Sequence, residues 1–183
     1  MAKKKNEKKK YIDQEVMFEG ARVALPVFVD EYSKECDRKS VIENKITTLI
    51  TIEVAILTVF IPIIPFDNIK TYLFGVYNSI TIATTIACFL LVIGITLMSI
   101  SFVVLMKAIG IQTYSKVDIA QLQDNLNFDA NSVEKGLCDH YKSIIYENSN
   151  LNDKKANEYK VCLPITVVAF FILALGTILL KIL

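Results

Sequence analysis

Three long apolar blocks constrain this chain more than any other feature of its sequence. They are Ile46–Phe66, Val76–Met106 and Val161–Leu180, and most charged residues lie between them. A helix needs roughly 20 mostly apolar residues to cross the hydrocarbon core of a bilayer, and each block meets that length. The sequence therefore predicts an all-α membrane protein with transmembrane helices at residues 46–66, 76–106 and 161–183.

The basic residues predict an orientation, which the net charge of +1 hides. Residues 1–45 carry eleven lysines and arginines and Lys107–Lys160 carries seven, whereas the loop Asp67–Gly75 carries only Lys70. Loops rich in lysine and arginine stay in the cytoplasm. We therefore expect the N-terminus in the cytoplasm and the C-terminus outside.

The segment before the first block predicts a tail and a helical arm. Residues 1–10 contain six lysines and no aliphatic anchor, which is typical of a basic disordered tail. Residues 11–45 predict a cytoplasmic helical arm with a break or bend at Pro26, because proline cannot donate a helical hydrogen bond. The second block, 76–106, is longer than a bilayer needs, so we expect it either to tilt or to extend into the cytoplasm as a stalk, and favour the stalk.

The segment 107–160 predicts two further cytoplasmic helices. The first covers about Ser115–Leu126, and the second begins after Asn131, whose spacing from Glu134 is typical of an N-cap. In the second helix five apolar residues recur at three and four and predict one buried stripe: Val133, Leu137, Tyr141, Ile144 and Ile145. We expect this helix to continue straight into the third span. A helical domain of this size is marginal alone, so a homo-oligomer is expected.

Glu53 is the only charged residue within the first block, roughly 12 Å along the helix from Lys45. A carboxylate at such depth is costly, so Glu53 must be protonated, paired or facing water. No lysine, arginine or histidine lies inside another block, and we expect that a lone subunit offers Glu53 no partner. We interpret Glu53 as functional. The alternative is a protonated Glu53 that hydrogen-bonds a threonine or serine of a neighbouring helix.

Hydroxyl side chains form stripes along the first two blocks. On the first, Thr47, Thr48, Thr51 and Thr58 lie opposite Glu53 on a helical wheel. Such residues either let helices pack closely or line a wetted pore, and both interpretations stay open. The candidate pore residues are Glu53, Thr81, Thr85, Thr96 and Ser99.

Motifs for catalysis and for metal binding are not found in the sequence. It contains no Ser-His-Asp set, no phosphate-binding glycine loop and no H-E-x-x-H. The single histidine, His140, lies two residues from Cys138 on a different helix face, which does not make a zinc site. We therefore expect neither an enzyme nor a cofactor.

Local basic clusters are the candidate ligand-binding residues, although segment 107–160 balances its seven lysines against eight acids. Basic side chains that lie near aromatic rings can bind the phosphates and bases of nucleotides. The candidate residues are Lys34, Arg38, Lys39, Tyr141 and Lys142. The alternative is that these residues form ordinary solvated helix faces.

The layout of the chain resembles that of known defence proteins. A charged helix, DRKSVIENKITTLITIEVAILT, runs into a short span hairpin, and IIYENSNLNDKKANEYK leads into a further span. This resembles the small bacterial membrane effectors encoded beside nucleotidyltransferases in anti-phage defence operons, either SLATT-type effectors or the channel component of Hailong-type systems. The resemblance implies an oligomeric pore in the bacterial inner membrane, gated by a nucleotide or oligonucleotide that a partner nucleotidyltransferase makes.

The sequence thus leads to one main hypothesis and two alternatives. The main hypothesis is an oligomeric, ligand-gated ion channel with Glu53 and the hydroxyl stripes near the conduction path. The alternatives are a non-conducting membrane scaffold or regulatory subunit, and a holin-like toxin that needs no ligand.

Overall fold

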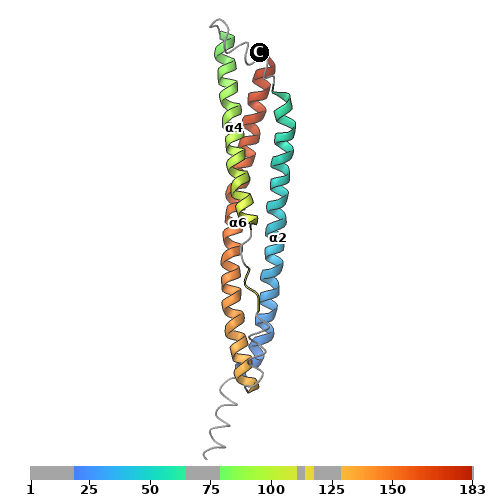
Figure 1. Ribbon diagram of the computed structural model, residues 1–183, viewed down its shortest axis with the longest axis vertical. Helices are drawn as coiled ribbons and strands as arrows, with labels where there is room; N and C mark the ends of the chain where they lie inside the picture. The colour runs from blue at the N-terminus through green and yellow to red at the C-terminus, as the bar shows by residue number, and fades with distance from the viewer. Residues whose placement is uncertain (1–18, 65–78, 111–113, 118–128, 183) are drawn as a thin grey trace, which may run out of the picture. The chain divides into compact units, whose positions relative to one another are not determined.

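The computed structural model describes residues 19–64, 79–110, 114–117 and 129–182, without the side chains of residues 19 and 79–81. Three helices make up nearly all of this part (Figure 1): α2 Glu19–Ile63, α4 Ser79–Ile109 and α6 Ala130–Ile182. They have 45, 31 and 53 residues. None of the described residues lies in a β-strand, and the predicted all-α fold is confirmed.

Each of the three helices contains a stretch long and apolar enough to cross a membrane, which confirms the three predicted spans at this level. Their outward surfaces are apolar as well: Phe89 is 65% exposed and Phe171 is 64% exposed. Large exposed hydrophobic side chains in such density are unfavourable in water and are typical of helices that contact lipid. The protein is therefore membrane-embedded. Where the bilayer begins and ends along each helix stays a prediction.

The chain divides into two compact units. The charged unit consists of Met1–Ser40 and Thr113–Asp153, and the apolar unit consists of Val41–Gln112 and Lys154–Leu183. Helices α2 and α6 contribute residues to both units, whereas α4 belongs to the apolar unit alone.

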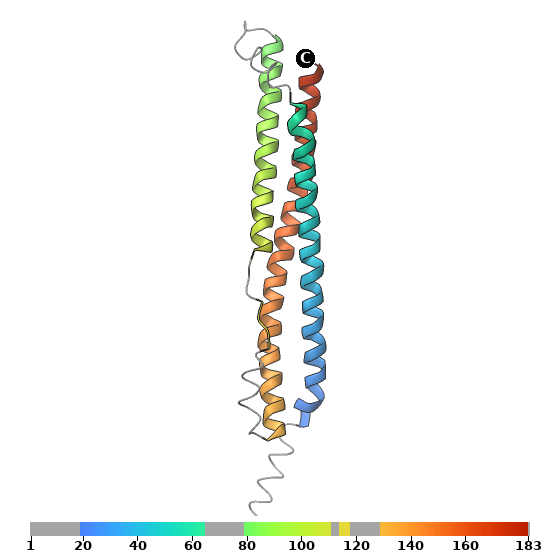
Figure 2. The same ribbon diagram turned by 45° about the vertical axis from the view of Figure 1, so that its right-hand side comes forward.

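Within the apolar unit, segments of α2, α4 and α6 lie side by side in both views (Figures 1 and 2). Their buried side chains form two hydrophobic clusters. The first cluster contains Ile64, Ala87, Leu91, Met98, Ala169, Leu173 and Leu180. The second contains Ile42, Ile46, Leu49, Leu105, Ala108 and Cys162. The second cluster draws on all three helices, and Ile56, Leu57 and Phe60 of α2 pack against the first, so the two clusters set the lateral order of the unit.

Two glycines allow α4 and α6 to approach each other closely. A Cβ on Gly94 would lie 2.7 Å from Leu173 Cγ, and a Cβ on Gly176 would lie 3.0 Å from Leu91 Cδ2. Each helix thus places a leucine over the glycine of the other. Small residues at helix contacts are the usual means of packing helices in lipid, where apolar side chains gain little by leaving the solvent.

The charged unit pairs the first part of α2 with the first part of α6. The rings of Tyr32 and Tyr141 meet edge to face with centroids 5.7 Å apart, and the Cys138 thiol donates to the Ala21 carbonyl over 3.4 Å. Of the stripe predicted on α6, Ile144 is buried. The other four members, Val133, Leu137, Tyr141 and Ile145, are half-buried.

Helix α2 passes through Pro26 without interruption, so the expected break there is wrong, and the bend expected as its alternative stays a prediction. Proline removes one hydrogen bond, to the carbonyl four residues earlier, and its ring crowds that carbonyl. The turns on both sides keep their hydrogen bonds, and one loss does not end a helix of this length. By contrast, the expected continuity of the last helix is confirmed, since α6 includes Pro164 and runs on to Ile182.

The N-cap of α6 is Asp129 rather than the expected Asn131. Asp129 Oδ2 accepts a hydrogen bond from the Ser132 N–H over 3.1 Å, and its carbonyl accepts from the Val133 N–H. Asn131 already lies inside the helix, because Asp129 offers the same short acceptor two residues earlier. These hydrogen bonds from Ser132 hold the pKa of the Asp129 carboxyl below its ordinary value.

Two further expectations concern the segments that flank the helices. Of the helix expected at about Ser115–Leu126, the described residues Tyr114–Val117 are not helical, and the remainder lies outside the described residues. The tail expected at residues 1–10 also lies outside them. Helix α4 ends at Ile109, just past the predicted span.

Candidate functional site

A polar cluster lies inside the apolar unit, with one member from each helix: Glu53 of α2, Ser101 of α4 and Thr166 of α6. The Thr166 hydroxyl donates to Glu53 Oε1 over 2.5 Å, and the Ser101 hydroxyl lies 3.1 Å from the Thr166 hydroxyl. Because Thr166 has a single hydroxyl hydrogen, Ser101 donates to Thr166 when Thr166 donates to Glu53. Glu53 and Ser101 are 0% exposed and Thr166 is 3% exposed.

The second carboxyl oxygen of Glu53 is the one acceptor of this cluster that has no hydrogen-bond donor among the described residues. Glu53 Oε2 is buried and has no hydrogen-bond partner among the described residues. A buried carboxyl oxygen without a donor is unfavourable, and it gains from a proton, a water molecule or a cation. The cluster is thus a three-helix carboxyl site with one acceptor free.

The expectation that a lone subunit offers Glu53 no partner is wrong. Thr166 of the same chain donates a hydrogen bond to Glu53. The alternative interpretation of Glu53 expected such a hydrogen bond with a threonine or serine of a neighbouring helix. The sequence shows that Thr166 has a hydroxyl group. It does not show that this group lies level with Glu53 along the axis of the bundle. That height depends on how α6 packs against α2, which only the folded bundle defines.

The threonines of α2 face away from the bundle, as the helical wheel indicated. Each donates its hydroxyl to the carbonyl four residues earlier in its own helix: Thr47 to Glu43, Thr48 to Asn44, Thr51 to Thr47 and Thr58 to Val54. These hydroxyls are therefore satisfied within α2. The hydroxyl groups need no acceptor from outside α2, so this face of the helix can contact lipid, water or another helix.

The pore residues proposed on α4 do not join Glu53. Thr96 and Ser99 are exposed, and their hydroxyls donate to the carbonyls of Val92 and Ile95. Thr85 is also exposed. The Thr81 side chain lies outside the described residues. Sequence reasoning instead missed Ser101, because hydroxyls lie on several faces of α4 and nothing in their spacing marks the inner one.

The proposed ligand residues lie in the charged unit, and two of them already form ion pairs there. Lys34 pairs with Asp30 and Glu31, each over 2.7 Å. Arg38 binds Glu35 and Asp153, and these acids raise the pKa values of both basic groups, with Asp30 and Asp153 as the main causes.

The other three ligand candidates lie near aromatic rings. Lys39 lies 4.5 Å over the centre of the Tyr114 ring, within the range of a cation–π contact. Tyr141 packs against Tyr32. Lys142 lines a groove of the charged unit.

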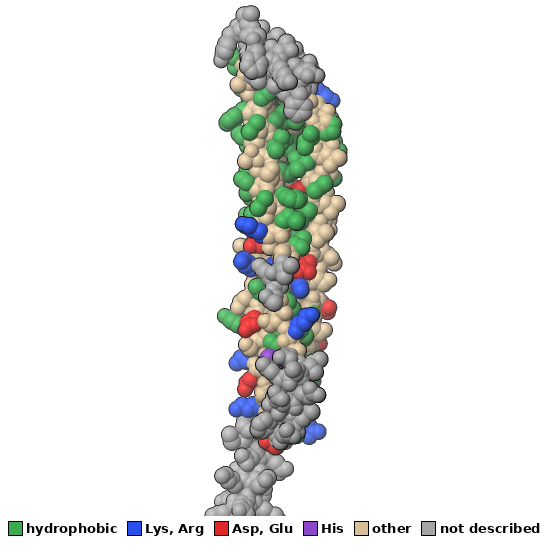
Figure 3. Space-filling view, viewed as in Figure 1, with side chains coloured by type: hydrophobic (Ala, Val, Ile, Leu, Met, Phe, Trp, Pro, Cys, Tyr) green, Lys and Arg blue, Asp and Glu red, His purple; other side chains and the backbone are tan. Residues whose placement is uncertain are grey.

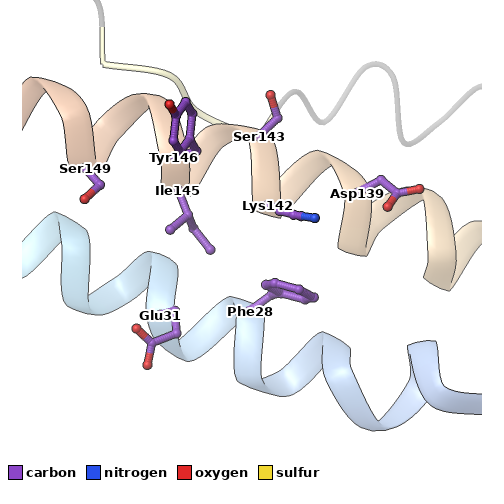
Figure 4. A pocket seen from close by; sticks show the side chains of 8 residues that line it. All are labelled: Phe28, Glu31, Asp139, Lys142, Ser143, Ile145, Tyr146 and Ser149. Atoms are coloured by element: carbon purple, nitrogen blue, oxygen red, sulfur yellow. The ribbon is translucent and has the colours of Figure 1, made fainter.

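This groove lies between α2 and α6 and has a volume of 630 Å³. Figure 4 shows Phe28 of α2 and Ile145 of α6 directed into the space between the helices, with Lys142 beside them. Glu31 and Asp139 also line the groove, so its lining residues carry two carboxylates and one ammonium. The groove suits an apolar or aromatic group, and it offers no excess positive charge to a phosphate.

Two buried asparagines of α6 hold the non-helical segment Tyr114–Val117. Asn148 accepts from the Ser115 N–H over 3.1 Å and donates to the Ser115 carbonyl over 3.0 Å. Asn152 donates to the Glu35 carbonyl and carboxylate, and its amide nitrogen also lies 3.5 Å from the Tyr114 hydroxyl. Both asparagines are 0% exposed. Burial raises the pKa of the nearby Tyr114 hydroxyl to about 12, so it remains un-ionised at neutral pH.

The described side chains form no group of three His, Cys, Asp or Glu residues that could hold a metal ion. Comparison of the chain with protein-family models, curated proteins and solved structures finds no match.

Proposed function

We propose that this protein is an oligomeric membrane effector that forms an ion channel in the bacterial inner membrane, opened or closed by a ligand on the cytoplasmic side. The observation that carries the proposal is the buried Glu53 with its open oxygen. Ionisable residues inside spans are costly and usually mark an ion or proton pathway. Spans that only anchor a protein gain nothing from such a group.

The hydroxyl face of α2 supports an assembly of several copies around the pathway. Thr47, Thr51 and Thr58 lie on the surface of the apolar unit, with their hydrogens used inside the helix. Their oxygens can still accept a hydrogen bond from water or from another copy. In the proposed channel this face lies toward the neighbouring copies and lines the conduction path together with Thr96 and Ser99.

The charged unit is the proposed cytoplasmic ligand domain. The resemblance implies a nucleotide or oligonucleotide made by a partner nucleotidyltransferase. Its phosphates would have to replace the carboxylates now paired with Lys34 and Arg38. The pairs of Lys34 with Asp30 and Glu31 and of Arg38 with Asp153 are solvent-exposed and hold their partners weakly, so a multivalent phosphate can displace them, whereas the Glu35 side chain is only 17% exposed. Helices α2 and α6 run on from the charged unit into the apolar unit. A change in the ion pairs between them can therefore be transmitted along these helices to the membrane spans.

Electrical recording from purified protein in planar bilayers tests this function. A channel gives unitary currents that change when a candidate nucleotide is added to the charged-unit side. The absence of current under every nucleotide would leave the scaffold alternative. Current that is independent of any ligand would favour the holin-like toxin.

The role of Glu53 is tested by comparing Glu53→Gln with Thr166→Val in the same recordings. Glu53→Gln keeps the side-chain shape and the acceptor for Thr166 but removes the charge, so conductance or cation selectivity should fall. Thr166→Val removes the partner and leaves the carboxyl, so conductance should persist. Unchanged conductance and selectivity in Glu53→Gln would make Glu53 a packing residue.

A further inference from the structure

Three lysines mark one boundary level in the apolar unit. Lys45 of α2, Lys107 of α4 and Lys160 of α6 each flank a stretch that carries no charge except Glu53. Their neighbours Ile46, Ala108 and Cys162 belong to a single hydrophobic cluster, so the three lysines lie near the same height of the bundle. Figure 3 shows that hydrophobic side chains predominate on one part of the visible surface and charged ones on another. The predicted boundary of the hydrocarbon core lies at this height.

A groove between α2 and α6 crosses that level. It has a volume of 350 Å³ and is lined by Asn44, Lys45 and Tyr159 together with apolar residues that include Leu49, Ile52 and Leu163. Leu49 is buried and lies in the second hydrophobic cluster, whereas Ile52 is 47% exposed and Leu163 is 39% exposed. Along α2 the lining begins with Val41, continues with the polar residues Asn44, Lys45 and Thr48, and ends with the apolar residues Leu49 and Ile52. The groove is therefore amphipathic along its length.

The polar lining has unused hydrogen-bond donors. Lys45 forms no ion pair with any residue the structure describes, and the side-chain amide of Asn44 has no hydrogen bond within the same part of the chain. The nearest acid along α2, Glu43, is bound to Lys155 over 2.6 Å. None of the described residues that line the groove is acidic. This site thus attracts an anion, in contrast to the groove of the charged unit.

We propose that this groove binds one anionic phospholipid of the surrounding leaflet. The Lys45 ammonium and the Asn44 amide hold the phosphate, and an acyl chain lies along Ile52 and Leu163. The location argues for a lipid as occupant, because the medium that surrounds this surface at this height is the lipid headgroup region. A lysine with an apolar stem reaches that region readily. Juxtamembrane lysines also favour the anionic lipids of the cytoplasmic leaflet.

The test counts lipids bound to the full-length protein by native mass spectrometry, with phosphatidylglycerol, phosphatidylcholine or inorganic phosphate added. One phosphatidylglycerol per chain should be retained, more tightly than phosphatidylcholine and without competition from phosphate. Lys45→Gln should weaken its binding about fivefold, the loss expected for one juxtamembrane cation. Leu163→Trp, which fills the apolar part of the groove, should also lower it.

Lys107→Gln is the matched control, since it removes a lysine at the same height on α4, away from the groove. It should leave lipid retention unchanged. An equal loss in Lys107→Gln, or equal binding of both lipids, would overturn the proposal and indicate general attraction to the membrane surface. Lipid-free protein that is dimeric and becomes monomeric in Leu163→Trp would instead make the groove a contact between copies.

Discussion

The two units of this protein use polar side chains in opposite ways. In the apolar unit Glu53, Thr166 and Ser101 bind one another across three helices, and the Thr166 hydroxyl also lies 3.1 Å from the Cys162 carbonyl of its own helix. In the charged unit Asn148 binds the backbone of a segment that is not helical. In lipid, the backbone N–H and C=O groups must form hydrogen bonds with one another, as they do in a helix. The polar side chains of the apolar unit are therefore free to fix the register between helices. Where water is near, polar side chains can hold an irregular segment in place.

The comparison extends to ion pairs. Lys155 of the apolar unit has a side chain only 5% exposed and binds Glu43, whereas Lys34 of the charged unit is 59% exposed beside Asp30 and Glu31. Screening by solvent and loss of side-chain entropy weaken an exposed ion pair. Removing one partner of a buried ion pair strongly destabilises the protein, because the other charge stays buried without a partner. The same substitution should thus have very different effects in the two units.

The largest effect is expected for Glu43→Gln. It leaves the buried Lys155 ammonium without its carboxylate, and loss of one partner of a buried pair costs about 3 kcal/mol. Unfolding in mixed detergent micelles, followed by circular dichroism, measures the change. Glu31→Gln makes the same substitution in the exposed pair and should have a much smaller effect. Equal effects would show that burial does not distinguish the two pairs.

Asn148→Ala should have the next largest effect. It leaves the Ser115 N–H and carbonyl without their side-chain partner. Because Ser115 is only half-buried, water can replace part of the lost hydrogen bonding, and the total cost should be about 1–2 kcal/mol. Hydrogen exchange at residues 114–117 should rise strongly, while exchange in α4 stays as it is. Asn150→Ala changes an exposed asparagine on the same helix and should alter neither. Normal protection at 114–117 in Asn148→Ala would mean that other contacts hold the segment.

Thr166→Val should destabilise the apolar unit by only about 1 kcal/mol, the usual magnitude for a hydrogen bond between helices in lipid. A double-mutant cycle with Ser101→Ala measures their coupling in the same micelle experiment. Coupling between Thr166 and Ser101 should be positive, since both donate within one chain of hydrogen bonds. Strict additivity would show that the cluster is not a connected network.

The smallest effect concerns the start of α6. The pKa of Asp129 is lowered in the folded state, so its capping contribution is present above its ordinary value of 3.8 and is lost as pH falls through the lower folded value. The amide signal of Ser132 should therefore shift in that acidic range. Asp129→Asn keeps an N-cap acceptor and should abolish the shift. A persistent shift would assign it to another group.

Several features could be predicted from the sequence because they depend on local composition. The spans follow from runs of apolar residues, and the continuity of α6 into the last span follows from a segment without a helix-breaking signal before Pro164. The outward face of Thr47 and Thr58 follows from the helical period and the position of Glu53. Local signals were less reliable at two positions. Pro26 was compatible with either an interrupted or a continuous helix, and either Asp129 or Asn131 could have served as the N-cap of α6.

By itself, the sequence determined that this chain forms long helices, that three of them can cross a membrane, and that one carries a carboxyl group in its apolar stretch. Only the tertiary structure decided which groups meet that carboxyl. Glu53 and Thr166 are far apart along the chain, and their contact depends on the axial register of α2 against α6. Close packing sets that register, through the cluster that buries Ile42, Ile46 and Leu49 of α2 together with Cys162 of α6.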